Sequence, residues 1–201
     1  MVADEVQCGY GRTGKLFAIE HWGVRPDIMI MAKGIANGFP LSGIVSRKEL
    51  MDLQPPGSMG GTYAGNAVAC AAAVAVVKAF QEEKVLDNVN ARGKELRGML
   101  QAAKDDPKTG HMIYDVRGLG LMLALEFTPG KGYASKVQAK CMEKGMLLLT
   151  TSIYDTLRFI PALNISKEDM AKGCEIIREA IEEVATGEDP KETGTKGQAL
   201  E

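Results

Sequence analysis

A short apolar segment that ends in a lysine constrains this chain more than any other feature. Residues 27–32 have the length and composition of a buried strand, and Lys33-Gly34 follows directly. Desolvation at the end of such a strand would favour the neutral amine, a nucleophile that forms a Schiff base with a carbonyl. The alternative is a lysine that points into water, as strand-end lysines generally do. The residues around Lys33 must decide between the two.

Composition excludes several classes of function. The chain has 201 residues, 45% of them hydrophobic, enough for one large domain or two small ones. A net charge of -2 gives no global field that would attract nucleic acid or an anionic membrane. The apolar run 67–77 is too short to span a bilayer. No close cysteine pair occurs, which predicts reduced thiols and no metal site; the four cysteines are Cys8, Cys70, Cys141 and Cys174.

The first part of the chain has the pattern of an α/β fold. A helix capped by Asn66 is expected to run to about residue 84 and, being apolar on every side in its first turns, to be buried. It should continue, after a break near Asp87, to Lys104. The other expected elements are strands over 2–4 and 27–32, a turn and strand over 38–45, and a short helix over 47–53. No element precedes the first strand, which predicts a chain that begins inside a larger fold.

The second part is predicted to be a separate α+β domain. The expected elements are a strand over 116–127 interrupted by Gly118 and Gly120, a helix over 134–144, strands over 146–150 and 157–160, and a helix over 166–184. The predicted division is therefore 1–104, then 105–186, then a polar and disordered tail at 187–201.

A glycine-rich segment, 9–14, satisfies the dinucleotide pattern G-x-G-x-x-G. With Lys15 it also satisfies all but the last position of a P-loop, where Leu16 replaces the hydroxyl that would hold magnesium. Both motifs need a hydrophobic strand directly before and a helix directly after, and neither is predicted here. We expect a loop that uses glycine for sharp turns, with a nucleotide site as the weaker alternative.

Acidic and amide side chains end the strand that precedes Lys33. Pyridoxal phosphate (PLP) enzymes need a carboxylate against the pyridinium nitrogen of the cofactor, and Asp4 is the candidate. Gln7 could donate to the phenolic oxygen of the ring, whereas Glu5 should face the other way because alternate strand residues do. The alternative for both carboxylates is a solvated loop.

Two further segments could bind anions. Gly60 to Asn66 places the hydroxyl of Thr62 and unhindered backbone amides just before a helix, which suits a phosphate, although such loops are often only turns. Arg158 lies in an apolar strand, where its guanidinium would match a carboxylate. The alternative is an internal salt bridge, for instance with Glu126.

Taken together, these segments resemble the class III, or ω-type, PLP-dependent aminotransferases. The spacing from Asp4 to Lys33 and from Lys33 to Thr62 agrees with that family. The motifs that carry the resemblance are Asp4-Glu5-Val6-Gln7, the glycine-rich segment 9–14, Ala32-Lys33-Gly34, residues 38–43, and Gly61-Thr62 with Gly65-Asn66.

The resemblance implies a fold-type I PLP enzyme in which Lys33 forms the internal aldimine and then moves a proton. It implies that Asp4 pairs with the pyridinium, Gln7 with the phenolic oxygen, and Thr62 with the cofactor phosphate of the neighbouring subunit. Arg158 would hold the carboxylate of a substrate. The implied reaction moves an amino group from an ω-amino or basic amino acid to a 2-oxo acid such as 2-oxoglutarate, in a homodimer with shared active sites.

The resemblance covers only the C-terminal half of a family member, and Cys8 stands where threonine is more usual. The end of the large PLP-binding domain followed by the small domain is therefore the predicted architecture. The rival hypothesis is a truncated, non-catalytic remnant or dimerisation partner that binds no cofactor. The expected compartment is the cytoplasm, with the mitochondrion as an alternative.

Overall fold

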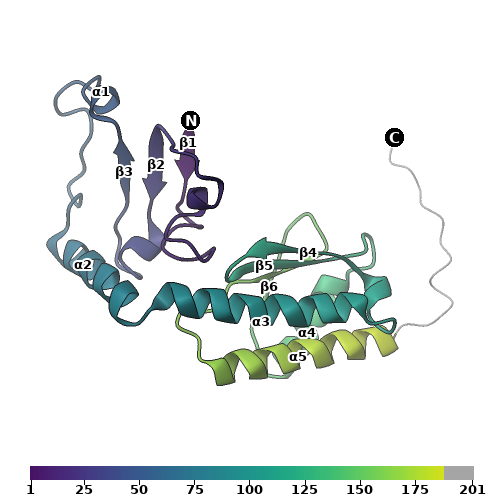
Figure 1. The fold of residues 1–201 in the computed structure, drawn as a ribbon. Coiled ribbons are helices and arrows are strands. Elements are labelled where there is room, and N and C mark those ends of the chain that lie inside the picture. Colours follow the sequence, from purple (N-terminus) through teal and green to yellow (C-terminus); the bar gives the residue numbers. More distant parts are fainter. Residues whose placement is uncertain (188–201) are drawn as a thin grey trace, which may run out of the picture. The chain divides into compact units, whose positions relative to one another are not determined.

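A computed structural model of the chain describes residues 1–187 and shows two compact units (Figure 1). The first contains residues 1–95, 118–123 and 160–166, and the second contains 96–117, 124–159 and 167–187. The predicted division at residues 104 and 105 stays a prediction. Residues 188–201 of the predicted tail lie outside the residues that the structure describes.

A three-stranded sheet organises the first unit. Its order is β1 (Val2–Asp4), β2 (Ile28–Met31), β3 (Gly43–Ser46), with β2 parallel to β1 and antiparallel to β3. Asp4 lies opposite Ile30 in the register, and the amide of Glu5 donates to the carbonyl of Ile30 at 2.9 Å. The carboxyl ends of β1 and β2 therefore meet at one edge, where α/β folds place their ligands. Strands were predicted at all three positions.

Helices α2 (Ala67–Glu82) and α3 (Val85–Asp105) follow the short helix α1 (Lys48–Met51). The predicted cap of α2 is present, since Asn66 Oδ1 accepts hydrogen bonds from the amides of Val68 and Ala69 at 3.0 and 3.1 Å. The helix breaks at Lys84, which has a φ of 50°, rather than near Asp87 as expected.

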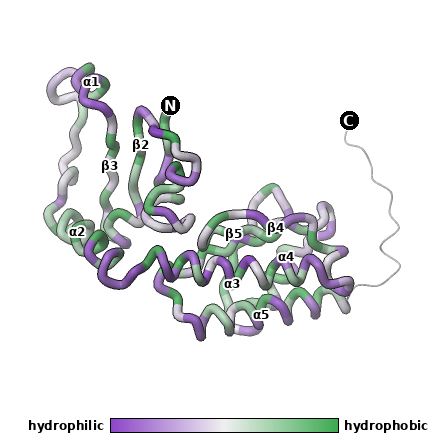
Figure 2. Tube along the Cα trace, viewed as in Figure 1, coloured by the Kyte–Doolittle hydropathy of each residue, from purple (hydrophilic) through white to green (hydrophobic). Residues whose placement is uncertain are grey.

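The expectation that α2 would be buried is wrong for this chain. Figure 2 colours most of α2 as hydrophobic, yet Ala69 is its only buried residue. Val68, Val74 and Val77 expose 61%, 57% and 53% of their surface. A helix face with this many exposed apolar side chains is typical of a surface that packs against another segment or subunit.

The second sheet has the order β4 (Ile113–Leu119), β5 (Met122–Phe127), β7 (Thr156–Phe159), β6 (Leu149–Thr150). A single strand over 116–127 was predicted, and the structure corrects this to two strands joined by a turn at Gly120-Leu121. Gly118 and Gly120 have φ of 123° and 54°, which glycine adopts readily, so the two glycines that appeared to interrupt one strand allow the chain to reverse.

The second unit has a complete hydrophobic core. Helices α4 (Tyr133–Glu143) and α5 (Lys167–Thr186) pack against each other, and α4 also contacts β6 and β7. Side chains from both helices and the sheet are almost fully buried, among them Leu125, Phe127, Val137, Leu157 and Ile181. Their burial supplies the main stabilising free energy of this unit.

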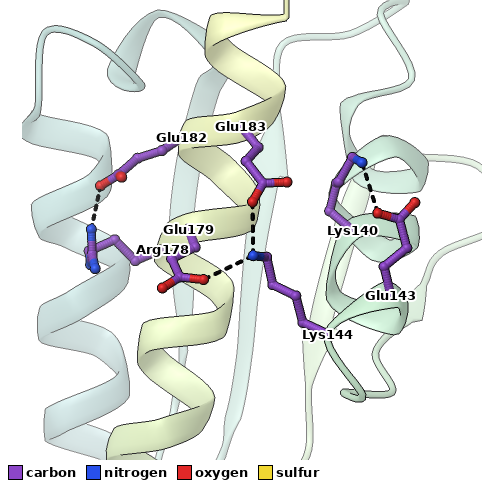
Figure 3. Close-up of polar contacts among 7 residues, drawn as sticks. All are labelled: Lys140, Glu143, Lys144, Arg178, Glu179, Glu182 and Glu183. Carbon is purple, nitrogen blue, oxygen red and sulfur yellow. Dashed lines mark hydrogen bonds and ion pairs between the residues drawn. The ribbon is translucent and has the colours of Figure 1, made fainter.

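Ion pairs join the two helices on their exposed side (Figure 3). Lys144, which follows α4, lies 2.9 Å from Glu179 and 2.8 Å from Glu183, both on α5. Hydrogen bonds to these carboxylates raise the pKa of Lys144 and lower that of Glu183. Because solvent reaches these charges, the ion pairs add little to the free energy of unfolding and mainly fix the orientation of α4 against α5.

Among residues 1–187, no helix is long and apolar enough to cross a membrane. The same residues contain no group of three or more histidine, cysteine or acidic side chains that could hold a metal ion. The four cysteines are free thiols.

The loop at residues 9–14 is held by backbone contacts that only glycine permits. A Cβ atom on Gly120 would lie 2.4 Å from the carbonyl carbon of Thr13, and one on Gly93 would lie 2.4 Å from the carbonyl oxygen of Gly120. The loop, the β4–β5 turn and α3 thus touch backbone to backbone. The amide of Leu121 adds a 3.0 Å hydrogen bond to the carbonyl of Arg12.

This packing predicts that alanine substitutions at two glycines of α3 change the free energy of unfolding in opposite directions. Gly93→Ala should lower the free energy of unfolding by about 1–3 kcal/mol, because its methyl group meets rigid backbone. Gly98→Ala, where no atom lies within 4 Å of the added Cβ, should raise it by roughly 0.5–1 kcal/mol through helix propensity. Urea unfolding of the two variants measures both, and equal effects would contradict the contact.

Candidate active site

Lys33 lies directly after the edge at which β1 and β2 end. It begins the 3-10 turn η2 (Lys33–Ile35) with a φ of 46°, a left-handed conformation that costs a non-glycine residue about 1–2 kcal/mol. The expectation of a desolvated lysine is wrong here: the residue is exposed, and every residue of β2 is partly exposed. The backbone strain, rather than burial, marks this position as special.

A cavity of about 590 Å³ brings two of the predicted site residues together. Gln7 and Lys33 both line it, and neither side chain has a hydrogen-bonding or ionic partner among residues 1–187. Its other walls come from the glycine-rich loop, from α2 and the start of α3, and from residues 160–164. An amine and a carboxamide without protein partners are thus available to a ligand in a partly apolar cavity.

Asp4 is the last residue of β1 and is exposed. It lies just before Val6 and Gln7, which line the cavity. One of its carboxylate oxygens, Oδ1, accepts a 3.0 Å hydrogen bond from the amide of Val6. The second oxygen remains available to a donor from outside the chain. Because β1 and β2 are adjacent and parallel, Asp4 at the end of β1 and Lys33 just after the end of β2 lie at neighbouring strand ends.

Glu5 points away from Asp4, as strand alternation predicts, and anchors the loop from inside. It is 2% exposed, and its carboxylate accepts hydrogen bonds from the amides of Ala18 at 3.0 Å and Ile19 at 2.8 Å, where η1 (Ala18–Trp22) begins. Cys8 Sγ donates to the same carboxylate at 2.9 Å. The segment from Asp4 to Cys8 is therefore fixed by a buried acceptor.

The glycines at positions 9, 11 and 14 of the glycine-rich loop pack directly against other parts of the protein. Added Cβ atoms would lie 2.7 Å from the Glu5 carbonyl oxygen at Gly9, 2.7 Å from the Phe80 ring at Gly11, and 2.3 Å from Asn90 Oδ1 at Gly14. On the side where a side chain would lie, each of these glycines meets protein atoms. This favours the expected structural loop over the nucleotide alternative.

Arg12 of this loop holds the segment that forms another wall of the cavity. Its Nη1 donates to the carbonyls of Leu121 at 3.1 Å and Pro161 at 2.6 Å, and burial lowers the pKa of the guanidinium. The contact was not foreseen, because no sequence pattern pairs position 12 with position 161. An arginine between closely spaced glycines was the only available signal.

Thr62 is exposed in an open loop before α2 and does not line the cavity. No atom lies within 4 Å of an added Cβ on Gly60 or Gly61, so the backbone there is accessible. The first amides of α2 are already occupied by Asn66, which leaves the loop rather than the helix end to meet a phosphate.

Arg158 lies on β7 in the second unit and is partly buried. The alternative of a salt bridge with Glu126 does not occur, because Glu126 pairs with Arg117. Arg158 has no ionic partner among residues 1–187. Its role as a carboxylate ligand remains a prediction.

Comparisons with known proteins agree on one family. Residues 1–181 match the family described as aminotransferase class-III. The chain is 43% identical over 192 residues to the 4-aminobutyrate aminotransferase GabT of Escherichia coli, covering 91% of this chain and 44% of that protein. It is 45% identical to the 5-aminovalerate aminotransferase DavT of Pseudomonas putida, with coverage of 92% and 44%.

Solved structures give the same result. The ornithine aminotransferase of Toxoplasma gondii, crystallised with oxidised glutathione and partially occupied by PLP at its active site, matches with a TM-score of 0.86 at 33% identity, covering 92% of this chain and 43% of that one. The acetylornithine aminotransferase of Elizabethkingia anophelis matches with a TM-score of 0.81 at 35% identity, covering 90% and 47%. The fold-type I assignment is thereby confirmed, and the chain spans less than half the length of these relatives.

The contact between Glu5 and Cys8 predicts that the Cys8 thiol reacts slowly. Burial, together with the adjacent Glu5 carboxylate, raises the pKa of Cys8 to about 12, so the thiol is protonated at neutral pH. A maleimide at pH 8 should modify exposed Cys70 at least about tenfold faster than Cys8. Glu5→Gln removes the negative charge and should speed Cys8 labelling.

Peptide mass spectrometry resolves the two sites, and Cys141, whose burial raises its pKa to about 11, serves as the unreactive reference. Equal rates at Cys8 and Cys70 in the wild-type chain would contradict the buried Glu5 contact.

Proposed function

Because this chain belongs to the class III aminotransferase family, we propose that it supplies the lysine-bearing part of a PLP-dependent active site. The family's cofactor is PLP. The observation that supports the proposal most is the cavity that places Lys33 and Gln7 together, with Asp4 at the end of the adjacent parallel strand. The proposed parent is an enzyme of about twice this length, so activity of the chain by itself is part of what must be tested.

The side chains at this edge fit PLP in their chemistry. Asp4 would keep a proton on the ring nitrogen, since its second carboxylate oxygen is unused within the described residues. Gln7 would donate an N–H to the phenolic oxygen. When bound, PLP supplies an electron-withdrawing ring that stabilises negative charge on the carbon beside the substrate's amino group.

Lys33 would serve first as nucleophile and then as base. Its amine would hold the cofactor covalently until a substrate's amino group takes its place. The freed amine would then move a proton at the substrate carbon, which requires Nζ to stay close to that carbon. A backbone fixed at the Lys33 turn limits the positions that Nζ can reach.

The proposed substrates are an ω-amino or basic amino acid and a 2-oxo acid such as 2-oxoglutarate. The relatives are aminotransferases named for 4-aminobutyrate, 5-aminovalerate, acetylornithine and ornithine, which supports this class. In the proposal the Arg158 guanidinium, which has no ionic partner among residues 1–187, binds a substrate carboxylate. We place the enzyme in the cytoplasm, where its thiols stay reduced.

A homodimer with a shared active site is also proposed. Thr62 lies in an accessible loop outside the cavity, as a residue that binds the phosphate of a neighbouring subunit's cofactor would. The loop leads into α2, whose exposed valines need a cover. A second subunit or the remainder of the parent enzyme would supply it.

The role of Lys33 is tested by spectroscopy of the purified chain with PLP. A visible absorption band should appear and should be absent from Lys33→Ala, and borohydride reduction should fix the cofactor on the peptide that contains Lys33. Lys15→Ala, which removes an exposed lysine of the glycine-rich loop, is the matched control and should keep the band. A wild-type chain that folds but gives no band would favour the non-catalytic remnant.

The role of Thr62 is tested by PLP affinity. Thr62→Ala should weaken binding about tenfold, the usual cost of one hydrogen bond to a charged group, while Thr62→Ser keeps the hydroxyl and should bind nearly as well as wild type. Fluorescence titration measures both dissociation constants. An alanine variant with unchanged affinity would rule out the phosphate contact.

A further inference from the structure

Tyr10 touches the Lys33 turn on both sides of the lysine. An added Cβ on Gly34 would lie 2.9 Å from Tyr10 Cβ and 3.6 Å from its Cγ, so the tyrosine packs directly on the Gly34 backbone. The Tyr10 hydroxyl donates to Met31 Sδ at 3.9 Å. Gly34 directly follows Lys33, and Met31 lies two residues before Lys33.

Tyr10 is itself held firmly in place. Its φ of 52° is as unusual as that of Lys33, and it stands between Gly9 and Gly11 in the close-packed loop. The Phe17 ring meets it edge to face at 5.6 Å between ring centroids. The amide of Gly11 donates to the carbonyl of Leu16 at 3.1 Å and closes the loop around it. A fixed side chain of this kind can hold its neighbour.

We propose that Tyr10 is a positioning residue for Lys33: it holds the lysine's strained backbone so that Nζ stays at the cavity. A left-handed lysine persists only where its surroundings enforce it. Within residues 1–187, the Tyr10 side chain supplies such a contact at Gly34 and at Met31. Tyr10 acts through these two residues, and its catalytic relevance rests on the proposed function.

The requirement for glycine at position 34 follows from the same contact. Gly34 adopts an ordinary φ, so it is not needed for backbone freedom; its missing side chain instead makes room for Tyr10. Tyr10 and Gly34 should therefore be coupled in a double-mutant cycle. Residues that do not touch and share no partner would instead have additive effects.

Amide hydrogen exchange tests the proposal without cofactor. The amide of Ile35 donates to the Ala32 carbonyl at 3.1 Å and that of Ala36 to the Lys33 carbonyl at 3.4 Å, so both report on this turn. Tyr10→Ala should speed their exchange about tenfold. Tyr10→Phe, which loses only the hydroxyl contact, should have a smaller effect.

Tyr114→Ala provides the matched control, because Tyr114 is a 65% exposed tyrosine of the second unit. It should change exchange at Ile35 and Ala36 less than about twofold. A rise spread equally over α3 in Tyr10→Ala would show general loosening and overturn the proposal, as would an effect no larger than that of Tyr114→Ala.

The double-mutant cycle covers the case in which Tyr10→Ala fails to fold. Gly34→Ala should speed exchange at the turn in the wild-type background. In a Tyr10→Gly background, which tolerates the positive φ and removes the opposing Cβ, adding Gly34→Ala should cause little further change. Equal effects in both backgrounds would overturn the proposal.

Binding of PLP gives a second readout that separates this proposal from the proposed function. If wild type is trapped by borohydride on Lys33, Tyr10→Ala should reduce the trapped fraction at limiting PLP, and Tyr10→Phe should retain most of it. An undiminished fraction in Tyr10→Ala would count against positioning. If wild type traps no PLP, the proposed function fails, while the exchange measurements still decide whether Tyr10 holds the turn.

Discussion

Backbone contact between the loop at residues 9–14 and its neighbours is the constraint on which the candidate site depends. Thr13 meets the turn at Gly120, and Gly120 meets Gly93 of α3, at separations that exclude any side chain. Asn90 adds a 3.0 Å hydrogen bond to the carbonyl of Gly14. The fixed loop then presents Tyr10 to the Lys33 turn. Glycine allows close packing here, so the same sequence pattern has a structural role that differs from its role in nucleotide-binding proteins.

The two units differ in how completely their apolar residues are buried. The second unit buries large side chains from its sheet and both of its helices. In the first unit, β2 is only half-covered and α2 exposes several valines. The chain matches 44% of the length of the relatives GabT and DavT. In the proposed function, the edge where β1 ends at Asp4 and β2 ends before Lys33 would be one part of a larger site.

Local sequence patterns predicted most of the strands and helices. The features that they did not predict depend on contacts between segments far apart in the sequence. The strand that ends at Asp4, the strand that ends just before Lys33 and the cap at Asn66 follow from short-range rules, and the structure shows them. The burial of Lys33 was inferred from the apolar character of its strand, but burial depends on what packs against a strand. The contact of Tyr10 with Gly34 joins positions 24 residues apart, and no periodicity encodes it.

A crystal structure of the chain with PLP tests the central claim most directly. The account predicts continuous electron density from Lys33 Nζ to the cofactor, with the ring nitrogen within hydrogen-bonding distance of Asp4 and the phenolic oxygen near Gln7. Cofactor bound through another lysine, or a ring nitrogen distant from Asp4 while Lys33 is modified, would contradict it.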